Sequence, residues 1–271
     1  VCQRLWNSWD EDAVVMDRQN AVFADASKVH RVEHEGRFYK SRGPLNVTRS
    51  PQNGPALIQA GTSPKGIEIA AKYADAVFAI HPRSKEAASY YADVKNLMAT
   101  FGRDPDHCAI LFGAQPILGN SEAEALEKQE EHNSLVPLEG GMALLSGHLN
   151  FDLSTLPPDA EMMDRTEPEL QRSRRISRKD DGKSMTIKEV AQRHGESVGL
   201  PQFVGTPMSV ADQLEAFFDE VGGDGFMLSP IYCPGAIEEF VDLDVPELQR
   251  RGRFRMSYSG TTQRDHLRQD H

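Results

Sequence analysis

The sequence predicts an α/β fold built on parallel strands. From Pro55 onward, short apolar runs alternate with amphipathic stretches bounded by capping residues, which is typical of successive strand–helix units. The chain has 271 residues, and an α/β barrel of about 250 residues forms a single domain. Length and pattern together favour one α/β domain over residues 1–271.

Four apolar runs are expected to be strands. They are residues 56–60, 76–80, 108–112 and 226–228. Each run is short and is bounded by turn or capping residues, as buried strands are. Because a helical stretch follows or precedes each of them, successive strands should run parallel to one another.

Capping residues mark the expected helix ends. Ser, Thr and Asn side chains satisfy the free N–H groups at a helix start, and glycine adopts the left-handed conformation that ends a helix. The expected starts are Ser63, Ser84, Ser121 and Thr186, and the expected glycines past helix ends are Gly102 and Gly222. Ser121 and Thr186 each have a glutamate three residues later, the spacing of a capping box.

Two segments do not fit the strand–helix alternation. Residues of about 130–205 separate the third and fourth strands by more chain than one helix requires, so they are interpreted as a long insertion before the last strand. Residues 13–54 are irregular, and the runs 29–32 and 37–39 are expected to form a hairpin there. The chain opens without Met on apolar residues at helical spacing, so we expect a further piece upstream.

Composition excludes several classes of protein. The 41 acidic residues exceed the 30 basic ones and give a net charge of −11, which disfavours nucleic acid and anionic membranes as partners. No apolar run is long enough to cross a bilayer. The three cysteines are too few and too scattered for a disulfide framework or a metal pair, which favours the reducing cytoplasm.

The strongest local motif lies between the first strand and its helix, at residues 59–66. Ser63 is placed as an N-cap and Pro64 as the first helical residue, while Gly61 permits a tight turn. A helix N-terminus presents unpaired N–H groups and a partial positive charge. The turn therefore suits an anion, most simply a phosphate ester, and the alternative is an ordinary helix start that binds nothing.

Seven stretches resemble the nitrilotriacetate and dibenzothiophene-sulfone monooxygenase family, the large components of two-component monooxygenases within the bacterial-luciferase-like superfamily. They are SPQNGP (50–55), QAGTSPKG (59–66), AAKYADAVFA (70–79), FVGTP (203–207), DGFML (224–228), VPELQRRG (245–252) and YSGTTQRDHL (258–267). They occur in the family's order across nearly the whole chain.

The resemblance implies a fold and a cofactor site. It implies a (β/α)8 TIM barrel of luciferase-like type, of which this sequence is the C-terminal portion. It also implies that Gly61, Thr62 and Ser63 contact the phosphate of reduced FMN, with Gln59 and Ala60 at the strand end nearby. The family's candidate catalytic histidine would lie upstream, so the catalytic residues of this chain stay unknown.

The implied activity is that of a cytoplasmic FMNH2-dependent monooxygenase. Reduced FMN would come from a separate NAD(P)H-dependent flavin reductase, and dioxygen would supply one oxygen atom to a small organic substrate. An oligomer of identical chains is expected. Two alternatives stay open: a deazaflavin-dependent oxidoreductase of the same superfamily, and a truncated remnant or interaction module without turnover.

Other candidate residues are weaker. His81 and Gln115 each follow an expected strand, where barrel enzymes place reactive groups. The sequence offers no carboxylate or cysteine at a useful spacing from His81, so His81 is expected to be a solvated or supporting histidine, and Gln115 is supported no better. His30 and His34 are four residues apart without a third ligand, so no metal site is predicted. The segment from Arg172 to Lys179 is either a solvated loop or a lid that attracts anions.

Overall fold

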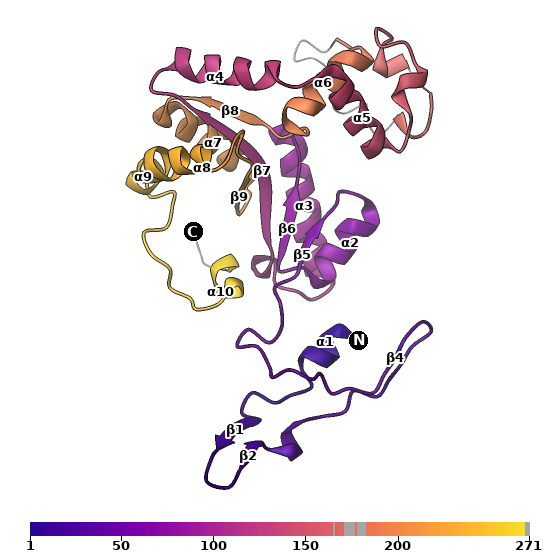
Figure 1. Ribbon diagram of the computed structural model, residues 1–271, viewed down its shortest axis with the longest axis vertical. Coiled ribbons are helices and arrows are strands. Elements are labelled where there is room, and N and C mark those ends of the chain that lie inside the picture. Colours follow the sequence, from indigo (N-terminus) through magenta and orange to yellow (C-terminus); the bar gives the residue numbers. More distant parts are fainter. Residues whose placement is uncertain (165, 171–176, 178–182, 269–271) are drawn as a thin grey trace.

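A parallel sheet of five strands forms the centre of the computed structural model, which describes residues 1–164, 166–170, 177 and 183–268. Figure 1 shows β5, β6 and β7 rising above the N-terminal segment, with β8 across the top of the sheet. They are β5 (Ile58–Ala60), β6 (Ala76–Ala79), β7 (Ala109–Leu118), β8 (Gln202–Gly205) and β9 (Gly225–Leu228). Their order is β5-β6-β7-β8, and β9 pairs with β7 as well.

Among the described residues the sheet is open. Strand β5 pairs only with β6, and β9 pairs only with β7, so the expected barrel is not closed here. The parallel direction of the strands is confirmed, with Gln59 opposite Val77 and Val77 opposite Ile110. The structure thus shows a parallel α/β sheet without the full barrel.

All four expected strands are present, but a fifth was missed. Strand β7 is ten residues long and continues to Leu118. Its first half pairs with β6 and β9, and its second half pairs with β8. Strand β8 lies within the segment expected as the insertion, so that boundary was wrong. Only Phe203 and Val204 are strongly apolar in β8. Because this local pattern is weak, pairing with β7 makes the segment a strand.

The helices that pack on the sheet begin and end close to the predicted capping residues. They are α2 (Pro64–Tyr73), α3 (Ser84–Thr100), α4 (Glu122–Ser134) and α7 (Pro207–Val221). Ser63 and Ser121 cap α2 and α4 through their side chains, and Gly222 ends α7 with φ of 73°. Ser84 is instead the first residue of α3, because Arg83 occupies the cap position. The largest buried side chains of this core include Val77, Met98, Ile110 and Phe112.

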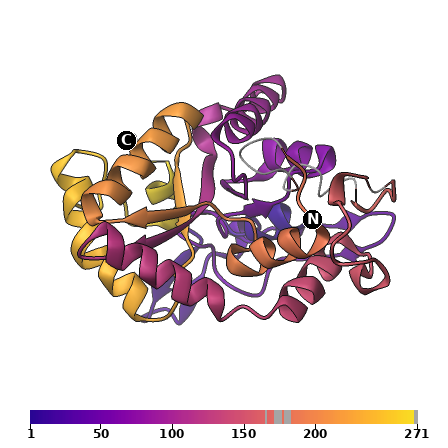
Figure 2. The same ribbon diagram turned by 90° about the horizontal axis from the view of Figure 1, so that it is seen from above.

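The insertion forms a helical unit with its own core. Helices α5 (Leu138–Leu149) and α6 (Ile187–Ser197) pack together with the short turns η3 (Leu153–Thr155) and η4 (Met162–Asp164). Gly141 lies inside α5, where a Cβ would come within 2.4 Å of the Ala191 carbonyl oxygen. This glycine therefore lets the two helices approach closely. Figures 1 and 2 show the α5–α6 pair at the upper end of the sheet.

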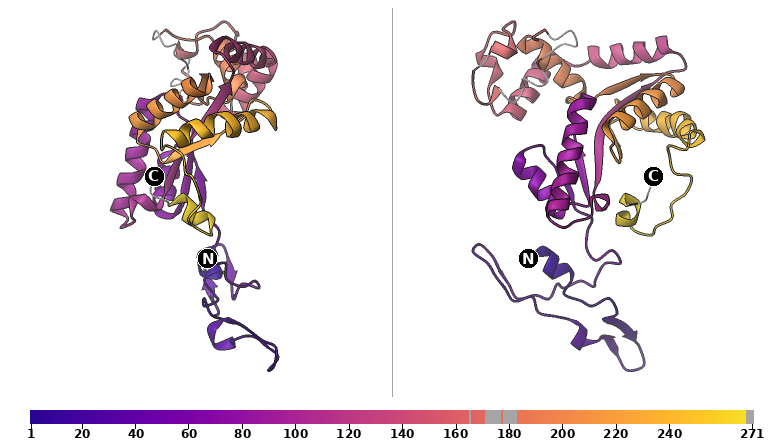
Figure 3. Two further views of the ribbon diagram at one scale, coloured as in Figure 1. Left: turned by 90° about the vertical axis from the view of Figure 1, so that its left-hand side faces the viewer. Right: turned by 180° about the vertical axis from the view of Figure 1, so that it is seen from behind.

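The N-terminal segment extends away from the sheet (Figure 3). It contains α1 (Cys2–Trp6), the turn η1 (Ala26–Lys28), and two antiparallel pairs. The pairs are β1 (Val14–Asp17) with β2 (Val22–Ala24), and β3 (His34–Glu35) with β4 (Lys40–Ser41). The expected hairpin is thus present, but its strands lie a few residues later than the apolar runs that suggested it.

The C-terminal part crosses the sheet and returns to its lower end (Figures 1 and 3). It contains α8 (Gly235–Glu239), the π-helical turn η6 (Phe240–Asp244), α9 (Val245–Arg250) and α10 (Gln263–Leu267). Arg264 of α10 donates to both carboxylate oxygens of Asp75 at 3.0 and 3.2 Å. None of the described helices combines the length and apolar character needed to cross a membrane.

Asp244 in η6 is a buried carboxylate. It is fully buried, and neither of its carboxylate oxygens has a hydrogen-bond partner among the described residues. Burial raises the pKa of Asp244 to about 7, and the charge of Glu247 adds to this while Arg251 opposes it.

We expect Asp244→Asn to stabilise the protein in alkaline solution. A pKa raised in the folded state means that ionisation costs stability, so the wild-type free energy of unfolding should decline as pH rises from about 4 to about 7. The asparagine variant should lack this decline and exceed the wild type by about 2 kcal/mol or more at pH 8. Urea denaturation at pH 5 and pH 8 measures both; equal pH dependence in the two proteins contradicts the prediction.

Candidate functional site

The predicted turn joins β5 to α2 at the carboxyl edge of the sheet. Gln59 and Ala60 are the last residues of β5, and the Gln59 side chain donates to the Ala60 carbonyl oxygen at 3.1 Å. Gly61 has φ of +148°, which L side chains rarely adopt. Ser63 Oγ accepts a hydrogen bond from the Gly66 N–H at 3.1 Å and so caps the helix. The structure therefore builds the tight turn that the sequence predicted.

The turn presents unused donors. Within the described residues, the backbone N–H groups of Thr62, Ser63 and Lys65 make no hydrogen bond. Thr62, Ser63 and Lys65 are exposed, and the Lys65 ammonium adds a positive charge beside the helix start. Because α2 has ten residues, its aligned peptide dipoles add partial positive charge at the same place. An anion with several acceptor oxygens suits this arrangement.

Tyr90 of α3 holds the turn from inside. Its hydroxyl donates to the Gly61 carbonyl oxygen at 3.1 Å, and the side chain is only 5% exposed. Burial raises the pKa of Tyr90 to about 12, so the hydroxyl stays protonated at neutral pH. His81 lies against it, with ring centroids 4.9 Å apart. His81 is buried, so of its two expected roles, a solvated or a supporting histidine, the solvated one is wrong.

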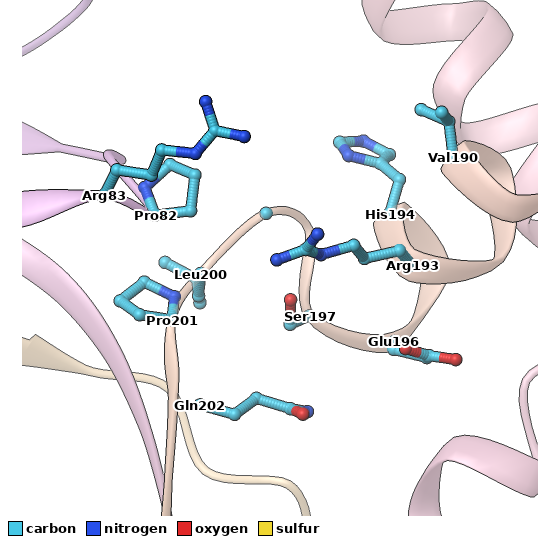
Figure 4. A pocket seen from close by; sticks show the side chains of 11 residues that line it. Pro82, Arg83, Val190, Arg193, His194, Glu196, Ser197, Leu200, Pro201 and Gln202 are labelled. Atoms are coloured by element: carbon cyan, nitrogen blue, oxygen red, sulfur yellow. The ribbon is translucent and has the colours of Figure 1, made fainter. Parts of the chain in front are cut away.

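A cavity of about 310 Å³ lies between the segment that follows β6 and the insertion. Pro82 and Arg83 form one wall, and α6 forms the other (Figure 4). The remaining wall is the stretch that leads into β8, including Leu200 and Gln202. Arg83 and the Gly61 turn come directly after neighbouring parallel strands, so the cavity and the turn share one edge of the sheet.

Two histidines meet at the wall of this cavity. His148 Nδ1 lies 2.8 Å from His194 Nε2, so one ring donates to the other. His194 is 8% exposed, and its Nδ1 is buried without a partner among the described residues. Burial, together with the nearby His148, lowers the pKa of His194. The lowered pKa favours the neutral form of the His194 ring.

The weaker candidates Gln115 and His30 make contacts that support the fold. Gln115 lies inside β7 rather than after a strand, and its side-chain oxygen accepts from Gln202 at 2.7 Å. His30 pairs with Asp10 at 2.9 Å, and the described residues contain no cluster of three or more potential metal ligands. The basic side chains Arg172, Arg174, Arg175, Arg178 and Lys179 lie outside the described residues.

Comparison with known proteins decides the family. Residues 1–225 match the family described as luciferase-like monooxygenase. The chain belongs to the luciferase-like monooxygenase family. It is 42% identical over 98% of its length to dibenzothiophene-sulfone monooxygenase of Rhodococcus erythropolis, and 37% identical over 98% to nitrilotriacetate monooxygenase component A of Aminobacter aminovorans. The matched region is 60% of each of these relatives, so the chain spans about three fifths of their length.

Solved structures confirm the luciferase-like α/β fold. The crystal structure of DmoA from Hyphomicrobium sulfonivorans matches 99% of this chain and 57% of its own, with 33% identity and a TM-score of 0.88. Riboflavin lyase, solved with modified FMN and riboflavin, matches 98% of this chain and 58% of its own, with 26% identity and a TM-score of 0.85. The family match and the sequence identities confirm the resemblance to the dibenzothiophene-sulfone and nitrilotriacetate enzymes.

The sequence did not identify Tyr90 or the cavity. The buried positions of α3 are Ala87, Tyr90, Val94 and Met98. Their spacing of three and four residues is helical, so the pattern was available in the sequence. No such signal exists for the cavity, because its walls come from segments more than a hundred residues apart.

Proposed function

We propose that the chain is part of a flavin-dependent monooxygenase that uses reduced FMN and dioxygen to oxygenate a small organic substrate. Its relatives are named monooxygenases, and one is the component A of its system. By analogy, a separate NAD(P)H-dependent flavin reductase supplies the reduced flavin. The five parallel strands form part of a (β/α)8 barrel. The enzyme assembles from identical chains.

The Gly61–Ser63 turn carries this proposal. The N-terminus of α2 offers an anion the exposed Thr62 hydroxyl and three backbone N–H groups that have no hydrogen-bond partner among the described residues. A phosphate monoester carries nearly two negative charges and three acceptor oxygens at neutral pH, which match these donors. We therefore assign Gly61, Thr62 and Ser63 to the FMN phosphate, with Gln59 and Ala60 beside it at the strand end.

The residues of the chain would bind and orient the cofactor. The flavin supplies the oxygen chemistry when it is bound. The Thr62 and Ser63 amides would hold its phosphate, while Tyr90 supports the turn through its hydrogen bond to the Gly61 carbonyl oxygen. The insertion, whose helix α6 faces Arg83 at the same edge of the sheet as the turn, would limit access of water to the reacting atoms.

Comparing FMN with riboflavin tests the proposal. The two flavins differ by the phosphate, so the full-length protein should bind reduced FMN at least about tenfold more tightly than reduced riboflavin under anaerobic conditions. Thr62→Ala removes one hydroxyl donor and should reduce that ratio, while Thr48→Ala, a threonine before β5, serves as control. Oxygen uptake with a flavin reductase should then require FMN. Equal affinity for the two flavins contradicts the assigned site.

Tyr90→Phe should weaken FMN binding about fivefold. The change removes the hydroxyl that donates to the Gly61 carbonyl oxygen and keeps the ring, so the turn loses its support without loss of packing. The matched control is Tyr91→Phe, which removes a hydroxyl that donates to Asp224 at 3.1 Å. Both variants should lose similar stability in thermal denaturation. If Tyr90→Phe and Tyr91→Phe weaken FMN binding equally, the assignment of Tyr90 as a positioning residue is contradicted.

A further inference from the structure

The cavity beside α6 has a charge that differs from the rest of the chain. The protein carries 11 more acidic than basic residues. Arg83 and Arg193 nevertheless line this cavity from opposite walls, and Glu196 is the one carboxylate among the described residues that line it. Figure 4 shows the guanidinium of Arg193 extending into the space between the walls, while the Glu196 side chain points the other way. The cavity is therefore locally basic.

Arg193 is available for a ligand. Its side chain is exposed on α6, and it makes no hydrogen bond or ion pair with the described residues. Arg83, on the opposite wall, has Glu86 as an ion-pair partner at 3.6 Å. A guanidinium carries five N–H donors in a planar fork that matches carboxylate and sulfonate oxygens. Arg193 thus offers the cavity a guanidinium that has no partner among the described residues.

The other walls suit the carbon skeleton of a small molecule. Pro82, Leu200 and Pro201 contribute apolar surface, and Ser197 and Gln202 contribute polar groups. Gln202 is held in place because it donates to Gln115 at 2.7 Å and accepts from Gln129 at 2.6 Å. A volume of about 310 Å³ accommodates a compact organic molecule.

We propose that this cavity binds the negatively charged group of the substrate, a carboxylate or sulfonate, through Arg193 with Arg83 on the opposite wall. The inference rests on the proposed function, because it places the substrate at the same sheet edge as the flavin turn. It selects acidic organic molecules over neutral sulfides, sulfones and alkanes. Recognition of the anion through a guanidinium makes Arg193 a determinant of substrate specificity.

Matched pairs of probes test the charge preference. Calorimetric titration of the full-length protein would compare benzoate with benzamide, and benzenesulfonate with methyl phenyl sulfone. The anion of each pair should bind about tenfold more tightly or better. Arg193→Gln should lower affinity for the anions about tenfold and leave the neutral probes unchanged, and Arg193→Lys should retain most of the preference. Arg37→Gln, on the exposed turn between β3 and β4, is the control and should match the wild type.

Three results would overturn the inference: equal binding of anionic and neutral probes, an Arg193→Gln variant with wild-type preference, or no binding of any probe at millimolar concentration. The ratio of FMN to riboflavin affinity, measured on the same wild-type protein, separates this inference from the proposed function. An intact ratio without anion preference contradicts only the substrate class. A ratio of one contradicts the flavin site.

Discussion

Replacing Gly61 by alanine should lower FMN affinity between about tenfold and a hundredfold. At φ of +148° an alanine is strained by about 1–3 kcal/mol, and the turn relieves the strain by changing conformation. The Thr62 and Ser63 amides would then lose their common direction, so the phosphate would lose several hydrogen bonds at once. Fluorescence titration with FMN under anaerobic reducing conditions measures the change.

Gly102→Ala is the matched control for this variant. Gly102 has φ of +70° past the end of α3, and a Cβ there would meet no atom within 4 Å. The substitution thus imposes backbone strain without changing the turn. It should lower the melting temperature and preserve FMN affinity. A similar loss of affinity in both variants would show that the effect comes from general destabilisation rather than from the turn.

Asp75→Ala should lower the free energy of unfolding by about 3 kcal/mol, equivalent to roughly 8 °C in melting temperature. Asp75 is 6% exposed and accepts hydrogen bonds from the Leu57 N–H and from the guanidinium groups of Arg264 and Arg268. Its removal leaves two cations without their shared partner and releases α10 from the lower end of the sheet. Differential scanning calorimetry measures the change.

The pH dependence provides a second measurement of the same contact. Burial would raise the pKa of Asp75, but the hydrogen bonds from Arg264 and Leu57 outweigh it and lower the pKa overall. Because the folded-state pKa lies below the ordinary value, this stabilisation is present at neutral pH and is lost as pH falls below about 4. Asp75→Ala should lack that acid-dependent loss. Asp219→Ala, which removes an exposed partner of Arg253, should stay within about 1 kcal/mol of the wild type.

Local signals predicted most of the central fold. Ser63 and Ser121 cap the helices that they were expected to start, because a cap depends on hydrogen bonds within four residues. Strand β8 was missed because its burial comes from pairing with β7, about ninety residues earlier in the chain. The periodicity of a sequence does not show which distant strand it will pair with. Gly141 lies in the segment interpreted as an insertion, and its contact with α6, which is distant in the sequence, makes it a helix-packing residue.

The candidate site was predicted only in part, because some of its residues come from elements that are distant in the sequence. The turn from Gln59 to Ser63 is contiguous, so its shape follows from Gly61, Ser63 and the proline after them. Tyr90 reaches the turn from a different helix, and Arg193 reaches the cavity from the insertion. These contacts depend on how the elements pack, which a single sequence does not specify.

A crystal structure of the full-length protein with FMN is the most direct test of the flavin turn. The phosphate oxygens should lie within hydrogen-bonding distance of the Thr62 and Ser63 backbone nitrogens, at the N-terminus of α2. Soaking with riboflavin should leave that position to solvent or a free anion. A phosphate bound elsewhere, with the Thr62 and Ser63 amides directed into water, would contradict the account.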